Sequence, residues 1–157
     1  MREEKTALDE IERGILYYLQ VDARNMTDSD ISDHIGYSPT TVGTRIDDLE
    51  TAEIIKTYDP VINFEKAGFP YRLVLFVTAP TETRSELAHD LLEVHGVIRI
   101  RELLSGTENL QIEVVGRTRD EVAESIAAVE DTPVELVRSE VVKNQYSRPF
   151  DEFAPDQ

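Results

Sequence analysis

The sequence predicts an α+β fold, in which an N-terminal winged helix-turn-helix is followed by a ferredoxin-like domain with the order β-α-β-β-α-β. Two observations support this prediction. Between Leu8 and Leu49, apolar side chains recur at helical spacing in three short runs that are separated by turns. From residue 71 on, stretches rich in β-forming residues alternate with two helical runs.

Length and composition limit the classes of protein that fit. The 157 residues can form one domain or two small ones, and no apolar run approaches the ~20 residues that span a bilayer. Residues 1–5 are polar and lack the apolar core of a signal peptide, so a cytoplasmic protein is expected. The chain has no cysteine and three histidines, and we expect neither a metal nor a cofactor.

The chain carries 32 acidic and 16 basic residues, for a formal net charge of −16. Residues 1–64 contain 14 acidic and 6 basic side chains, and residues 65–157 contain 18 and 10, so each half nets −8. This even distribution, with few lysines, favours a halophilic protein over one with an acidic interaction tail. Because the Debye length is ~3 Å in molar salt, repulsion from DNA is screened and DNA binding remains compatible with the charge.

The first two helices are defined by their apolar spacing and their ends. A helix over residues 8–20 buries one apolar stripe, made of Leu8, Ile11, Ile15 and Leu19. Thr27 is a suitable N-cap for a second, shorter helix, with Asp30 completing a variant of the capping box. Gly36 ends this helix.

A third helix begins at Ser38-Pro39, an N-cap followed by proline at the first helical position. Val42, Ile46 and Leu49 form its core stripe. In a helix-turn-helix the second helix of the motif enters the major groove with its N-terminal residues on base edges. We expect Arg45 to offer a bidentate fork to guanine or phosphate, and Gly43 to permit close approach of the backbone to DNA.

The segments 54–58 and 61–62, joined by Asp59-Pro60, predict a two-stranded hairpin that would form the wing. Positive charges near the motif can contact phosphate without reading sequence. The complete set of predicted DNA-binding residues is Ser38, Thr40, Thr41, Thr44, Arg45, Arg24 and Lys56. Acidic residues later on the third helix, Asp47, Asp48 and Glu50, limit docking to its first two turns. A small helical bundle without any ligand is the alternative that periodicity leaves open.

The second half predicts six elements in the order β-α-β-β-α-β. They cover residues 71–78, 83–94, a strand from 97, 110–115, 119–129 and 134–142. Both helices of this fold pack on one face of a four-stranded antiparallel sheet, and the other face is expected to be covered by a second copy in a homodimer. We expect domains at 1–63 and 71–146, a linker at 64–70 and a mobile tail at 147–157.

Leu8-Asp9-Glu10-Ile11-Glu12-Arg13, Ile35 to Val42 and Ile54-Ile55-Lys56 resemble the leucine-responsive (Lrp/AsnC) regulators, and the resemblance spans nearly the whole chain. It implies a transcription regulator that binds double-stranded DNA as a dimer or as a higher assembly such as an octamer. It also implies a small effector, frequently an amino acid, near the hairpin at Ser105, Gly106, Thr107, Glu108 and Asn109. Residues 106–109 depart from the family's glycine-aspartate-aromatic-aspartate pattern, so a plain turn is an equal alternative.

Two further readings compete with a regulator. Siroheme decarboxylases share this two-domain arrangement, but no two of His34, His89 and His95 have catalytic or metal-ligand spacing. Arg99 and Arg101 could bind an anion, although surface arginines among many carboxylates are more often solvated ion pairs. The other competing reading is a non-specific architectural DNA-binding protein. The sequence favours a sequence-specific regulator that is not an enzyme.

Overall fold

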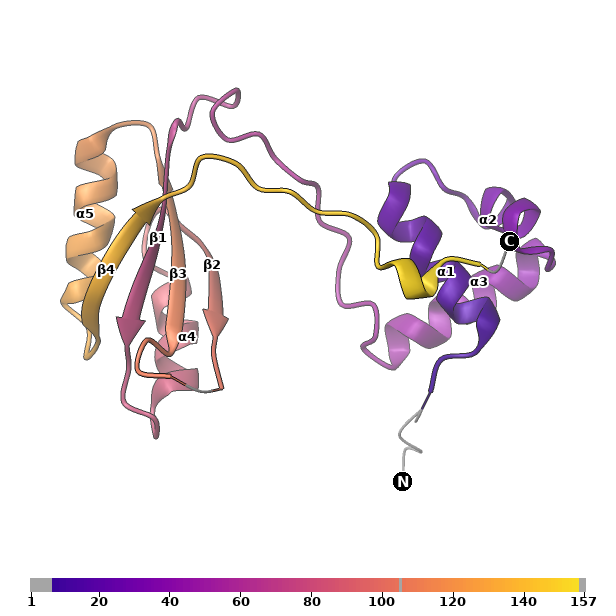
Figure 1. Ribbon diagram of the computed structural model, residues 1–157, viewed down its shortest axis with the longest axis horizontal. Helices are drawn as coiled ribbons and strands as arrows, with labels where there is room; N and C mark the ends of the chain where they lie inside the picture. The colour runs from indigo at the N-terminus through magenta and orange to yellow at the C-terminus, as the bar shows by residue number, and fades with distance from the viewer. Residues whose placement is uncertain (1–6, 105, 156–157) are drawn as a thin grey trace. The chain divides into compact units, whose positions relative to one another are not determined.

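The computed structural model describes residues 7–104 and 106–155, and the chain divides into two compact units. One unit combines the residues up to Pro60 with those from Tyr146 on, and the other spans Val61–Gln145. Figure 1 shows three helices in the first unit and a sheet with two helices in the second. No helix among the described residues combines the length and the apolar character that crossing a membrane requires.

Three capped helices build the first unit: α1 (Glu10–Asp22), α2 (Asp28–Ile35) and α3 (Pro39–Thr51). The capping box at Thr27, the left-handed Gly36 and the Ser38 cap are confirmed. α1 starts two residues later than predicted because Asp9 caps it: the Glu12 amide donates to Asp9 Oδ1 at 2.9 Å.

The core of the first unit lies where the three helices meet. Ile15, Ile31, Val42 and Leu49 are fully buried there, one or two from each helix. Burying each of these side chains stabilises the unit by about 1.5–3 kcal/mol relative to leaving it exposed. The apolar stripes predicted from sequence are therefore the ones that pack.

The segment after α3 differs from the predicted hairpin, because residues 54–70 form no strand. Val61 is 87% exposed and Ile62 is 48% exposed, and an isolated two-stranded hairpin is marginal in water. Tyr58 instead returns to α3, where its hydroxyl donates to Glu50 Oε1 at 2.7 Å. Burial and this carboxylate raise the pKa of Tyr58 to about 12.

The C-terminal segment also differs from the predicted mobile tail. Tyr146 to Pro155 belongs to the first unit, where a short 3-10 helix, η1 (Asp151–Phe153), contacts α1. The segment has no periodic pattern because it contacts α1 through a few separate residues, and periodicity is the signal that sequence reasoning needs.

The second unit has the predicted order of elements. Its bounds are β1 (Tyr71–Thr78), α4 (Arg84–Leu92), β2 (Val97–Glu102), β3 (Leu110–Gly116), α5 (Arg119–Glu130) and β4 (Glu135–Val141). The strands form one antiparallel sheet in the order β2-β3-β1-β4, with Leu75 opposite Ile112. Leu91 of α4 and Val129 of α5 are fully buried in the same core as these two residues. Both helices therefore cover the same face, as in a ferredoxin-like domain.

β2 contains a β-bulge, so its side chains do not alternate strictly between the two faces of the sheet. The register with β3 shifts between Val97 and Arg99, so that Val97 and Ile100 both pack against the core. Ile98 is left 37% exposed. A bulge depends on the pairing with the neighbouring strand, and strict period-two reading of one strand cannot predict it.

Candidate nucleic-acid interface

The N-terminal end of α3 presents several hydroxyl groups. Ser38, Thr40 and Thr44 are exposed, and Thr41 is half-buried. Ser38 Oγ accepts from the Thr41 amide at 3.1 Å and lies 2.8 Å from Thr41 Oγ1. Thr44 Oγ1 donates to the carbonyl of Thr40 at 3.0 Å. These hydroxyls keep unused acceptor positions, and each can bond a base edge or a phosphate.

Arg45 does not join this group of hydroxyls. Its Nη1 lies 3.1 Å from Asp9 Oδ2 and 3.1 Å from Glu12 Oε1, both at the start of α1. The Glu12 side chain is fully buried, whereas that of Arg45 is 32% exposed. The structure therefore directs Nη1 of Arg45 toward α1, and these contacts do not test the predicted contact with bases. The signal in the sequence for this partner of Arg45 was Glu12, which follows Ile11 of the apolar stripe of α1.

Gly43 lies beside the side chain of Asp28 on α2. A Cβ atom at this position would lie 2.7 Å from Asp28 Oδ2, which is the end of a flexible side chain that can turn aside. The expected close approach of the Gly43 backbone to DNA stays a prediction. Contact between helices is a tertiary property that the helical pattern of α3 alone does not reveal.

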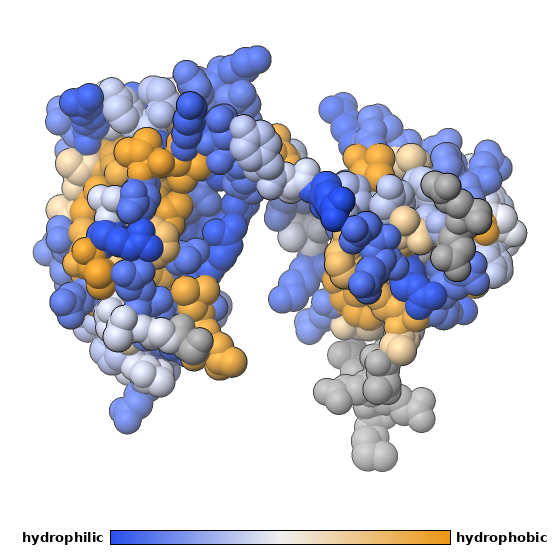
Figure 2. Space-filling view, in the orientation of Figure 1, coloured by the Kyte–Doolittle hydropathy of each residue, from blue (hydrophilic) through white to orange (hydrophobic). Residues whose placement is uncertain are grey.

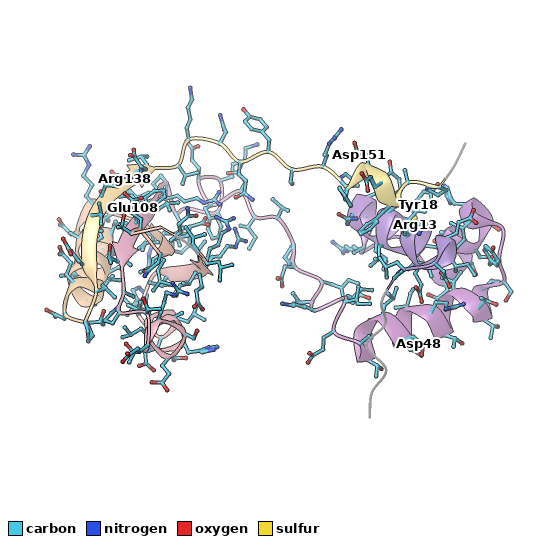
Figure 3. All side chains as sticks on the ribbon, turned by 60° about the horizontal axis from the view of Figure 1, so that its bottom comes forward. Arg13, Tyr18, Asp48, Glu108, Arg138 and Asp151 are labelled. Carbon is cyan, nitrogen blue, oxygen red and sulfur yellow. The ribbon has the colours of Figure 1, made fainter. Side chains whose placement is uncertain are left out.

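Two of the basic residues predicted to bind DNA lie outside α3 in the first unit, and acidic residues occupy the second half of α3. Arg24, in the turn after α1, and Lys56, after α3, are exposed, and neither forms an ion pair within residues 7–104 and 106–155. Both are free to contact phosphate. Asp47 and Asp48 are exposed on the second half of α3, and Figure 3 labels Asp48 there. Only the first turns of α3 are therefore suited to approach DNA.

The hairpin between β2 and β3 is held by contacts within the second unit. The buried Asn109 side chain accepts from the Ala79 amide and donates to the Ala79 carbonyl, both at 2.8 Å. The Thr107 carbonyl accepts from Thr78 Oγ1 at 2.7 Å, and Gly106 has a φ of 103°. These contacts build the turn without any ligand. Ser105 lies outside the described residues.

Glu108, the one carboxylate of this hairpin, already has a cationic partner on β4. Arg138 donates to both of its oxygens at 3.3 Å and to Glu140 Oε1 at 2.9 Å, and the pair is labelled in Figure 3. The two carboxylates raise the pKa of Arg138, with Glu108 as the larger cause. An amino-acid ammonium would have to compete with this arginine for Glu108.

The face of the sheet opposite the helices, which we call the open face, combines ion pairs with apolar side chains. Buried Glu113 accepts from Arg72 and from Arg99, the latter at 3.3 Å. Arg138 lies 3.6 Å above the centre of the Phe76 ring. Figure 2 shows apolar surface on this unit interrupted by hydrophilic groups. Arg99 thus forms an ion pair, as expected, but its partner is a buried carboxylate and not a solvated one.

His34 belongs to the first unit, and His89 and His95 belong to the second. His34 Nδ1 lies 2.7 Å from the Asp30 carbonyl and its ring packs 4.4 Å from that of Tyr18. His89 and His95 are exposed in the second unit. Within the described part of the chain, no group of three or more histidines and carboxylates is arranged to hold a metal ion.

The first unit has the helix-turn-helix arrangement, whose second helix can enter the major groove of DNA. Residues 8–56 match the family model described as winged helix-turn-helix DNA-binding. This match covers the three helices, the turn between α2 and α3, and the first residues of the segment after α3.

Similar proteins extend this result over most of the chain. An uncharacterized HTH-type transcriptional regulator of Pyrococcus furiosus is 28% identical over 91% of this chain and 99% of its own length. The leucine response regulatory protein of Mycobacterium tuberculosis has a TM-score of 0.73 and 22% identity, over 89% of this chain and 95% of that one. A Neisseria meningitidis transcriptional regulator, solved in complex with L-Met, has a TM-score of 0.73 and 18% identity, over 91% and 94%. The fold is therefore that of leucine-responsive-type regulators.

Proposed function

We propose that this protein is a sequence-specific transcription regulator of the Lrp/AsnC type, in which the first turns of α3 read the major groove. The observation that supports this most is the exposed group of hydroxyls at the start of α3, within residues that match a DNA-binding domain. The relatives are named as transcriptional regulators, which favours this function over the decarboxylase alternative.

The proposed contacts separate into base reading and positioning. Ser38, Thr40, Thr41 and Thr44 approach the bases, while Arg24 and Lys56 contact phosphates and fix the register. Arg45 orients α3 against α1 instead of touching DNA. A dimer would then make about four phosphate contacts from these two side chains, and the logarithm of affinity would fall with that of salt at a slope of about −3.6.

Dimerisation through the open face is part of the proposal. Val74, Phe76 and Val115 lie on that face between the ion pairs of Glu113 and Arg138, because they alternate with core residues along β1 and β3. A second copy would remove the half-buried Val74 and Phe76 from water and pack over Val115, which is already buried in the single chain. A dimer would also present two copies of α3 to one DNA duplex, in the manner of other helix-turn-helix dimers. The protein would act where the chromosome is, in the cytoplasm, and its even acidic surface suits high salt.

Binding to a library of random DNA fragments in molar potassium chloride tests the function. The fragments enriched by the protein are then compared with unselected fragments, using the wild type, Thr44→Ala and Arg24→Ala. We expect Thr44→Ala to weaken binding to enriched fragments by about threefold to tenfold, the value of one hydrogen bond, with little effect on unselected ones. Arg24→Ala should weaken both equally.

The matched control is Glu124→Ala, which changes an exposed residue of α5 in the other unit. Failure of the wild type to bind any fragment at any salt concentration would refute DNA binding. Binding without enrichment of any sequence would instead identify an architectural DNA-binding protein.

A further inference from the structure

The chain leaves its first unit and later returns to it. It passes into the second unit at Val61 and comes back at Tyr146, five residues after the end of β4. The end of β4 is secured on the sheet: the Val142 amide donates to the Arg72 carbonyl at 2.9 Å, and Arg72 Nη2 donates to Gln145 Oε1 at 2.5 Å. The two units are therefore joined by two covalent connections.

The returning segment is attached to α1 at several points, which Figure 1 shows as η1 lying against that helix. The Phe150 amide donates to Gln20 Oε1 at 3.2 Å. Pro155 lies 3.8 Å from the position that a Cβ on Gly14 would occupy. Phe150 and Phe153 stack edge to face with their centres 4.9 Å apart, on the first turn of this docked segment.

We propose that residues 146–155 act as a strap, which docks on α1 and limits the rotation of the DNA-binding unit relative to the ferredoxin-like unit. Without the returning segment, one backbone connection at the boundary between Pro60 and Val61 would join the two units, and the DNA-binding unit could swivel about it. The second connection leaves the second unit after Gln145, where this unit ends, and removes most of that rotational freedom.

The docking contacts also make the strap releasable. Phe150 remains 49% exposed, and the segment has one hydrogen bond to α1 among the described residues. Such a bond contributes about 0.5–1.5 kcal/mol, and the high effective concentration of a tethered segment adds to its occupancy. When the strap is docked, rotation of the DNA-binding unit relative to the ferredoxin-like unit is limited. When the strap is released, the DNA-binding unit rotates freely.

The absence of cysteine from the chain allows a direct measurement. Asp33→Cys on α2 and Glu124→Cys on α5 place one spin label on each unit, at exposed positions. Labelled protein is diluted with unlabelled protein so that the distance within one chain dominates. The width of the distance distribution is then compared for the full chain, a chain that ends at Gln145, the Phe150→Ala/Phe153→Ala variant, and the control Glu152→Ala.

We expect the truncated chain and the double variant to broaden the distribution at least twofold, and Glu152→Ala to leave it unchanged. Amide exchange of α1 is measured on each variant. Equal widths in all four proteins would overturn the strap. Broadening together with loss of amide protection in α1 would also overturn it, because the segment would then hold the fold of the unit and not its orientation.

One consequence rests on the proposed function: a strapped dimer should prefer one spacing between two DNA half-sites. Duplexes with half-sites at increasing separation should show a sharp optimum for the full chain and a flat dependence for the truncated chain. If no variant binds DNA while the distance distributions differ as expected, the regulator is refuted and the strap stands. If DNA binds with the same optimum in both chains, the strap is refuted.

Discussion

Arg45 gives the sharpest test of how α3 is held. Replacing it with alanine removes the cation that links α3 to Asp9 and Glu12. The ion pair between Arg45 and exposed Asp9 contributes about 0–1 kcal/mol to the free energy of unfolding. Removing one partner from a buried ion pair typically costs 3–5 kcal/mol, because the other charge stays desolvated.

The expected cost lies below that range, because Glu12 keeps the hydrogen bond from the Asp9 amide at 3.1 Å. We therefore expect Arg45→Ala to lower the free energy of unfolding of the first unit by about 2–3 kcal/mol. A unit of this size shifts its midpoint temperature by about 4–8 °C per kcal/mol, so the melting temperature should fall by roughly 10–20 °C.

The assay is amide exchange of α1 and α3 in the full chain, combined with thermal unfolding followed by circular dichroism. Arg24→Ala is the matched control, since it removes an exposed arginine without an ion pair in the described part of the first unit. Adding Glu12→Gln to Arg45→Ala should recover part of the loss, because a neutral amide costs less to bury than a charged carboxylate. If Arg45→Ala left stability unchanged and abolished enrichment of specific DNA, Arg45 would be a base-reading residue and the reasoning would be refuted.

Four further outcomes are expected. The hydrogen bonds from Thr27 hold the pKa of the Asp30 carboxyl below its ordinary value of 3.8. The stability that ionised Asp30 contributes is therefore fully present above pH 3.8 and is lost as the pH falls through the pKa of Asp30 in the folded protein. Thr27→Ala should raise this pKa toward 3.8 in a carboxyl NMR titration. Asn109→Ala should destabilise the second unit by about 2 kcal/mol in urea unfolding, because it leaves a buried amide and carbonyl unpaired. Gly43→Ala should stabilise the first unit by up to about 1 kcal/mol in thermal unfolding, because alanine has the higher helix propensity and the nearest atom, Asp28 Oδ2, ends a flexible side chain that can turn aside. A free amino acid that binds near Glu108 should raise the melting temperature of the wild type and not of Glu108→Gln.

Each of these has an outcome that would contradict it. An unchanged Asp30 titration in Thr27→Ala would show that the cap does not set this pKa. An unchanged urea midpoint in Asn109→Ala would show that the Ala79 backbone does not depend on this side chain. Destabilisation by Gly43→Ala would show that the Asp28 side chain cannot turn aside. Absence of any thermal shift with the twenty amino acids would remove amino-acid sensing at this hairpin and leave the plain turn.

Much of the fold could be predicted from the sequence because its signals are local. The caps at Thr27 and Ser38 satisfy amides of their own helices, and three or four residues are enough to recognise them. The strand over residues 71–78 was predicted with its observed bounds because it is continuous in β-forming residues. The β-α-β-β-α-β order follows from such local elements together with the few topologies that accommodate them.

The candidate site was predicted less completely, because the direction of a long side chain depends on its neighbours. Arg45 lies at the edge of the apolar stripe of α3, where the sequence permits either an outward or an inward direction. The buried carboxylate of Glu12 decides for the inward one. Asn109 was similarly predicted to bind an effector. In the structure, both the oxygen and the nitrogen of its side-chain amide form hydrogen bonds with the backbone of Ala79, thirty residues away.

The sequence alone thus determined the elements, their order and the class of protein, since periodicity, caps and turn residues act within a few positions of the chain. Only the tertiary structure decided which charged groups are available to DNA. It also decided that residues 146–155 pack on α1 and that residues 54–70 form no strand. Those outcomes depend on contacts between residues far apart in the chain, for which the local pattern carries no signal.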